Sequence, residues 1–106
     1  MLNKILIIAI MFFLIMLAGS AQAGGDPARG AELALECADC HGEDGKGYDD
    51  IPGLVGLDAS TLVKFLKAFK SGERTSVGDV MQEYSADLTD QEMADIAAYY
   101  ASLPDK

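Results

Sequence analysis

The chain has 106 residues and a mass of 11.2 kDa, which is enough for one small domain and too little for two ordinary ones. It carries 17 acidic and 8 basic residues, giving a formal net charge of −9 and an isoelectric point of about 4.3. Nucleic-acid binding needs clustered basic surface, so this composition argues against that class of function.

The N-terminal segment has the pattern of an export signal. Residues 5–17 form an apolar run without a charge, and a helix of that length spans roughly 20 Å, whereas crossing a bilayer takes roughly 30 Å. Ala21-Gln22-Ala23 has the A-x-A form that signal peptidase cleaves. We therefore expect residues 1–23 to be a cleaved signal peptide and residues 24–106 to be one exported domain. The alternative is an uncleaved anchor over residues 2–18.

The first helix of the mature chain is expected to begin at Asp26-Pro27. Asp can cap free backbone N–H groups, and Pro is tolerated at the first helical position. We predict that this helix runs to about Cys37 and that Gly30 permits close approach of another helix. Residues 42–56 contain five glycines and a proline, which predicts a long loop with fixed turns.

Two further helices are predicted. The second begins near Asp58, ends at Gly72 and buries one face at helical spacing, made of Leu62, Phe65, Leu66 and Phe69, with Lys64, Lys67 and Lys70 opposite. A loop is expected over residues 73–88. Thr89 and Glu92 then form a capping box for the third helix, which Pro104 ends and whose buried face contains Met93, Ile96, Ala97 and Tyr100. Since no segment has a convincing strand pattern, the sequence predicts an all-α domain of three main helices with long loops.

The motif with chemical content is Cys37-Ala38-Asp39-Cys40-His41. C-x-x-C-H is typical of covalent c-type haem attachment, in which two thiols one helical turn apart add to the two vinyl groups and the histidine binds the iron. Three alternatives for this motif are a redox dithiol, a zinc site and a structural disulfide. The dithiol lacks a βαβ context, zinc lacks ligands, and a disulfide over so short a loop contributes little.

His41 is the only histidine, so a second axial ligand must be another residue type. Met81 lies in a glycine-containing loop forty residues after His41 and is our candidate for the distal iron ligand. Met93 sits on the buried face of the third helix, where methionine usually fills core gaps. The alternative for Met81 is packing on the porphyrin with the sixth position open.

With these motifs in order, the chain resembles the small periplasmic class I cytochromes c of bacteria. The resemblance rests on residues 25–30, 37–42, 51–54 and 69–74, on Met81 and on the closing helix. It is most similar to the group that also occurs as tandem two-haem proteins and as haem subunits of sulfide-oxidising flavocytochromes. The resemblance implies that the first and last helices cross, with Gly30 facing Tyr99 and Tyr100. It also implies that the carbonyl of Pro52 accepts a hydrogen bond from His41.

The function expected from these features is periplasmic electron transfer through one His/Met-ligated haem c, with no substrate chemistry by the chain itself. The partners would be periplasmic redox proteins, met in small, salt-sensitive encounters. One alternative is the haem subunit of a sulfur-oxidising complex of the flavocytochrome c type. Another is a ligand-binding or sensing haem, which requires that Met81 not bind the iron.

Overall fold

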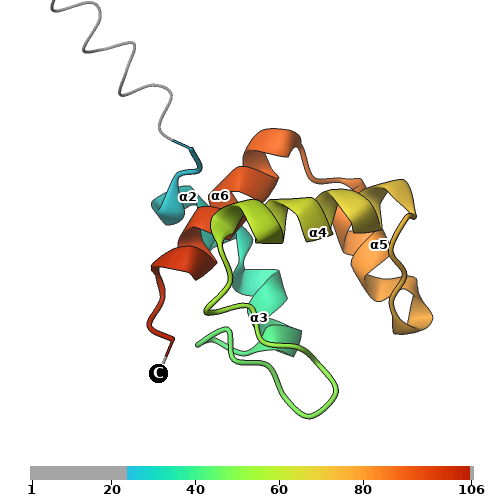
Figure 1. Cartoon of the computed structure of the whole chain (residues 1–106), viewed down its shortest axis with the longest axis horizontal. Helices are drawn as coiled ribbons and strands as arrows, with labels where there is room; N and C mark the ends of the chain where they lie inside the picture. Colours follow the sequence, from blue (N-terminus) through green and yellow to red (C-terminus); the bar gives the residue numbers. More distant parts are fainter. Residues whose placement is uncertain (1–23, 106) are drawn as a thin grey trace, which may run out of the picture.

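The computed structural model describes residues 24–105 (Figure 1). In chain order, the described part contains five α-helices and one 3-10 turn: α2 (Pro27–Leu33), α3 (Leu35–His41), α4 (Ala59–Ser71), η1 (Val77–Asp79), α5 (Val80–Ala86) and α6 (Asp90–Ser102). Extended backbone pairs there only at an isolated bridge between Tyr48 and Ile51. The all-α prediction is therefore confirmed.

The expected signal peptide, residues 1–23, lies outside the described residues. Within residues 24–105, none of the helices combines the length and the apolar character needed to cross a membrane.

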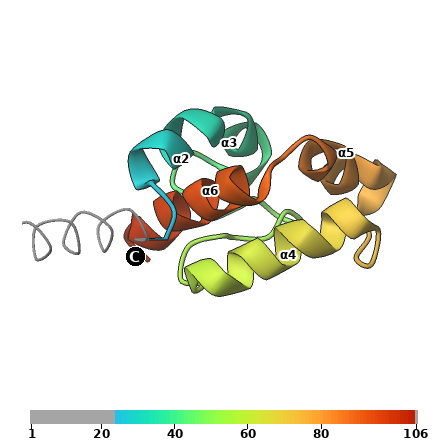
Figure 2. The same cartoon turned by 90° about the horizontal axis from the view of Figure 1, so that it is seen from above.

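Helix α6 lies at the centre of the domain. It packs against α2 on one side and against α4 on the other, and α4 also contacts α5; Figure 2 shows this order of layers. The buried apolar cluster joins α4, α6 and the junction between α2 and α3, and consists of Ala34, Leu62, Ile96, Ala97 and Tyr100. The face predicted for the last helix is confirmed, because Met93, Ile96, Ala97 and Tyr100 are all buried.

The first helix differs from its prediction at its end. It is interrupted at Ala34, and the second part, α3, continues past Cys37 to His41. Gly42, at φ 88°, ends α3 while its N–H donates to the carbonyl of Ala38. The whole C-x-x-C-H motif is therefore helical.

The predicted loop over residues 73–88 is wrong in its second half, where η1 and α5 lie. Helix α5 has only seven residues, too few for its apolar positions to show a helical period in the sequence. Its contacts with α4 stabilise it, and Ser85 is completely buried. Packing against α4 therefore determines that this segment is helical, although its local sequence does not predict a helix.

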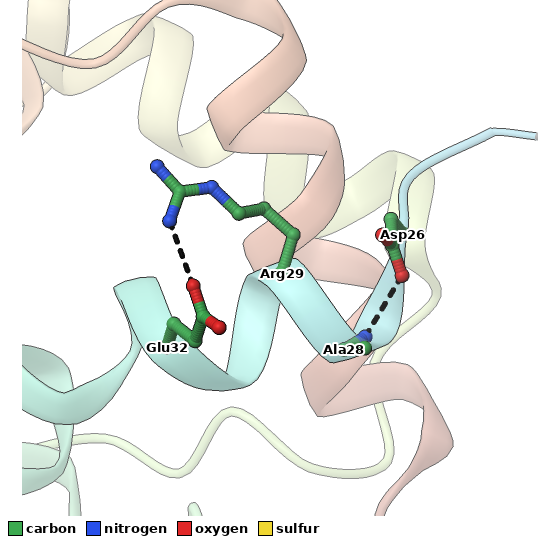
Figure 3. A network of polar contacts seen from close by, with 4 residues as sticks. All are labelled: Asp26, Ala28, Arg29 and Glu32. Carbon is green, nitrogen blue, oxygen red and sulfur yellow. Dashed lines mark hydrogen bonds and ion pairs between the residues drawn. The ribbon is translucent and has the colours of Figure 1, made fainter.

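The start of α2 shows the predicted cap (Figure 3). The carboxylate of Asp26 accepts a hydrogen bond from the N–H of Ala28 at 3.0 Å, with Pro27 at the first helical position. Arg29 and Glu32 form an ion pair at 2.9 Å on the exposed side of the helix, which contributes little to stability. The capping box is also present: the N–H of Thr89 donates to Oε1 of Glu92 at 3.0 Å, and the N–H of Glu92 donates to Oγ1 of Thr89 at 3.1 Å.

The backbones of helices α2 and α6 are in direct contact at Gly30. A Cβ atom placed on Gly30 would lie 1.9 Å from the carbonyl oxygen of Asp95 and 2.8 Å from the Cβ of Tyr99. The close approach that the resemblance implied is therefore present and faces Tyr99 and Asp95. Tyr100 meets the Tyr99 ring edge-on, with centroids 5.1 Å apart.

Asp95 ties the beginning of the domain to α6. Its side chain is 4% exposed, and its Oδ1 accepts hydrogen bonds from the N–H of Asp26 and from Nε2 of Gln91, both at 2.8 Å. The N–H of Asp26, followed by the Gln91 amide, lowers the pKa of Asp95 below its ordinary value. The charged carboxylate is thus the form that the fold stabilises.

We predict that Gly30→Ala separates α2 from α6. The added methyl group has no space between the two backbones, so the free energy of unfolding should fall by about 2 kcal/mol or more. Urea unfolding followed by circular dichroism measures this change. Gly24→Ala is the matched control, because a Cβ there meets no atom within 4 Å. Equal unfolding midpoints for the two variants would contradict the close contact.

A second prediction concerns acid stability. Because folding lowers the pKa of Asp95, its contribution is complete above the unfolded pKa of about 3.9 and is lost as the pH falls through the folded value. Asp95→Asn should therefore be less stable than the parent near neutral pH, and this deficit should shrink in acid. Unfolding midpoints between about pH 6 and pH 2 test this. The exposed Asp87→Asn variant should show no such convergence.

Candidate functional site

The two cysteines occupy different environments on α3. Cys40 is exposed, whereas Cys37 is half-buried and packs against the core cluster. Burial raises the pKa of the Cys37 thiol above its ordinary value. The spacing of three residues on a helix places both sulfurs on neighbouring positions of one face, so α3 presents them together.

His41 is the last residue of α3 and is buried. Its Nδ1 lies 2.8 Å from the carbonyl oxygen of Pro52, eleven residues later in the chain. A carbonyl only accepts, so Nδ1 carries the proton and donates it, which leaves Nε2 as the lone-pair nitrogen. The hydrogen bond that the resemblance implies between His41 and Pro52 is therefore present.

The loop that carries Pro52 is held by backbone hydrogen bonds. The N–H of Gly47 donates to the carbonyl of His41 at 2.7 Å, and the N–H of Leu54 donates to the carbonyl of Gly45 at 2.6 Å. These bonds fold the loop back onto the end of α3. The orientation of the His41 ring is thus set by the loop, and a ring fixed through one nitrogen is the usual arrangement of a metal-binding histidine.

The structure bears on two of the alternatives for the cysteines, the disulfide and the zinc site. Cys37 and Cys40 are free thiols, not joined by a disulfide. Across residues 24–105, no three His, Cys, Asp or Glu side chains are grouped so that they could hold a metal ion, and a zinc site would need such a group.

Met81 lies in the first turn of α5 and is half-buried. Its N–H donates to Oγ of Ser76 at 3.0 Å, and Ser76 donates to Oε1 of Gln82 through its N–H at 3.1 Å and through its hydroxyl. Nε2 of Gln82 donates in turn to Asp79 at 2.9 Å. We refer to Ser76, Asp79 and Gln82 as the polar knot; it fixes the backbone beside Met81.

The other methionine in the described part of the chain, Met93, is entirely buried in α6. Its side chain fills the core, which is the role expected for a methionine at that position. Of the two methionines, only Met81 is therefore partly exposed.

The residues present fit a c-type haem. No Cα atom of α3 lies within 8 Å of a Cα atom in α4, α5 or α6. Apolar side chains that pack at the edge of the core remain only partly buried, among them Leu54, Leu57 and Leu66. A large apolar group attached to α3 would cover such surface, and the two thiols with the oriented imidazole supply the donor set that it requires.

Sequence reasoning missed two features near this site. Tyr100, with its hydroxyl buried and unpartnered, lies next to the Cys37 sulfur, and burial raises the pKa of Tyr100. The polar knot was also missed. A serine in a turn is a sequence signal for such contacts, because serine side chains often bind nearby backbone N–H groups. The bonds of Ser76, however, reach residues five and six positions away, so they form only once the turn has folded.

Comparisons with known proteins agree with this geometry. The family model described as "Cytochrome c" matches residues 27–104. Cytochrome c-554(548) of Halomonas halodenitrificans is 40% identical over 80 residues, covering 74% of this chain and 96% of the relative. The cytochrome subunit of sulfide dehydrogenase of Chlorobaculum tepidum is 38% identical over 79 residues, covering 74% of this chain and 70% of the relative.

Among solved structures, the cytochrome c4 of Acidithiobacillus ferrooxidans superposes with a TM-score of 0.69 at 26% identity, covering 79% of this chain and 54% of that chain. The chain spans about half the length of the cytochrome c4 relatives that it matches.

Proposed function

Because the chain belongs to the cytochrome c family, we propose that it is a periplasmic electron carrier that transfers one electron at a time through a single covalently bound haem c. The observation that carries this proposal is the His41 imidazole, oriented by Pro52 at 2.8 Å directly after two cysteines on the same helix. When bound, the haem supplies a one-electron iron couple.

The chain's own residues divide the work of holding the group. Cys37 and Cys40 would form the thioether bonds, and His41 would bind the iron through Nε2 while the carbonyl of Pro52 fixes its ring. Met81 would occupy the second axial position. With His41 and Met81 both bound to the iron, no position would be left for a substrate, and the thioether of Met81 would raise the reduction potential.

Export follows from the same proposal. Residues 1–23 would direct the chain to the periplasm and be removed, leaving residues 24–106 as the cytochrome c domain. Its partners would be periplasmic redox proteins that donate and accept the electron.

A second candidate function is the haem subunit of a sulfur-oxidising complex. It is favoured by the match to the sulfide dehydrogenase cytochrome subunit. Size-exclusion chromatography of native periplasmic extract separates the two, since a free carrier elutes at the size of one small domain and a subunit elutes with its complex.

We predict that the purified periplasmic protein has the mass of residues 24–106 plus one haem, measured as intact mass. Cys40→Ala and His41→Ala should each abolish stable holoprotein, because the group contributes much of the apolar interior of so small a domain. Ser102→Ala, at the far end of α6, should accumulate normally. A folded, soluble and colourless Cys40→Ala protein would contradict the proposal.

We also predict that Met81→Ala leaves the haem attached, lowers its reduction potential and admits carbon monoxide. Absorption spectra with and without carbon monoxide, and voltammetry, provide the measurements. Met93→Leu is the control: it should cost less than about 1.5 kcal/mol of stability and leave spectrum and potential unchanged. If Met81→Ala matches the parent in both measurements, Met81 is not the ligand, and the sensing alternative or another ligand must be considered.

A further inference from the structure

Positive charge is concentrated on one segment of this acidic chain. Four of the 8 basic residues lie within residues 64–74, and all four are exposed: Lys64, Lys67, Lys70 and Arg74. Across residues 24–105 the only ion pair joins Arg29 and Glu32, so none of these four side chains forms an ion pair with a described carboxylate. The Lys70 amine instead donates to the carbonyl of Leu88.

Arg74 is held in a defined position. Gly72, at φ 81°, ends α4, and the N–H of Arg74 donates to the carbonyl of Ala68 at 3.1 Å. The guanidinium then lies 4.2 Å from the centroid of the Phe65 ring and 5.4 Å from that of Phe69. Stacking of this kind stabilises the cation and leaves its N–H donors at the edge available to an acceptor.

A hollow of about 670 Å³ is lined by residues of α4 and of the turn that follows it; Figure 2 shows α4 on the opposite side of α6 from α2. We call it the α4 hollow. Its lining combines apolar and basic side chains, with one carboxylate: Ser60, Val63, Lys64, Phe65, Lys67, Ala68, Ser71, Glu73 and Arg74. The site residues Cys37, His41 and Met81 do not line it.

We propose that the α4 hollow is the docking surface for an acidic protein, whose carboxylates Arg74 binds in bidentate geometry while Lys64 and Lys67 add attraction. This inference rests on the proposed function, since such a partner would be one of the redox proteins served by the carrier. An acidic protein fits this surface better than an anionic membrane. The chain as a whole has a net charge of −9, so a broad negative membrane surface would repel it, whereas a small partner would contact only the basic residues around the hollow.

The test titrates isotopically labelled holoprotein with an oligoglutamate peptide and follows the amide signals by NMR. Shifts should centre on residues 60–74 and weaken with added salt. Lys67→Gln should reduce the affinity, whereas Lys46→Gln, the same change outside the hollow, should not. Arg74→Lys keeps the charge but loses the fork that binds a carboxylate with two hydrogen bonds, and should weaken binding about fivefold, which corresponds to about 1 kcal/mol.

Any of these results would overturn the inference: equal effects of Lys67→Gln and Lys46→Gln, parent-like binding by Arg74→Lys, or stronger, Arg74-dependent binding to phosphatidylglycerol vesicles. Voltammetry on the same samples separates this inference from the proposed function. A reversible one-electron wave without peptide binding at the α4 hollow refutes the docking surface alone. Absence of the wave refutes the carrier function itself, whatever the peptide does.

Discussion

The contact between the backbones of α2 and α6 at Gly30 is the constraint on which the domain depends. Because Gly30 has no side chain, α2 packs directly against the backbone carbonyl of Asp95 in α6. The Asp95 carboxylate also accepts a hydrogen bond from the N–H of Asp26. Helix α3 follows α2 after one residue, Ala34, which belongs to the core. The contact between α2 and α6 therefore fixes the position of α3, which carries Cys37, Cys40 and His41.

The domain combines two kinds of stabilisation. Helices α2, α4 and α6 share the buried apolar cluster. Helix α3 and the loop after it are held instead by backbone bonds and by the hydrogen bond from His41 to Pro52. A small chain with so few buried apolar residues has little reserve of hydrophobic stabilisation, so a large covalently attached group completes the interior as well as supplying the redox centre.

Much of this arrangement could be predicted from the sequence, because its signals are local. The capping box at Thr89, the Asp26-Pro27 start and the stop at Gly72 each depend on neighbouring residues, and each is where the pattern placed it. The C-x-x-C-H motif is likewise contiguous. The family resemblance added the contact between His41 and Pro52, which spacing alone does not give.

What the sequence did not reveal depends on contacts made in three dimensions. Helix α5 exists through its packing on α4, and α3 runs past Cys37 to His41, where Gly42 adopts positive φ. The stacking of Arg74 on Phe65 joins residues nine apart across a helix end. The burial of the Tyr100 hydroxyl beside Cys37 arises only once α6 crosses the first helix.

The polar knot has a consequence for how the molecule fluctuates. Met81 is secured by hydrogen bonds among Ser76, Asp79 and Gln82 in a largely exposed segment, whereas the backbone before His41 is anchored by the α2 and α6 crossing. Segments with few buried apolar contacts and exposed hydrogen bonds open at lower free energy than the core. The segment that carries Met81 should therefore open at a lower free energy than the segment that carries His41, so the two sides of the site differ in local unfolding.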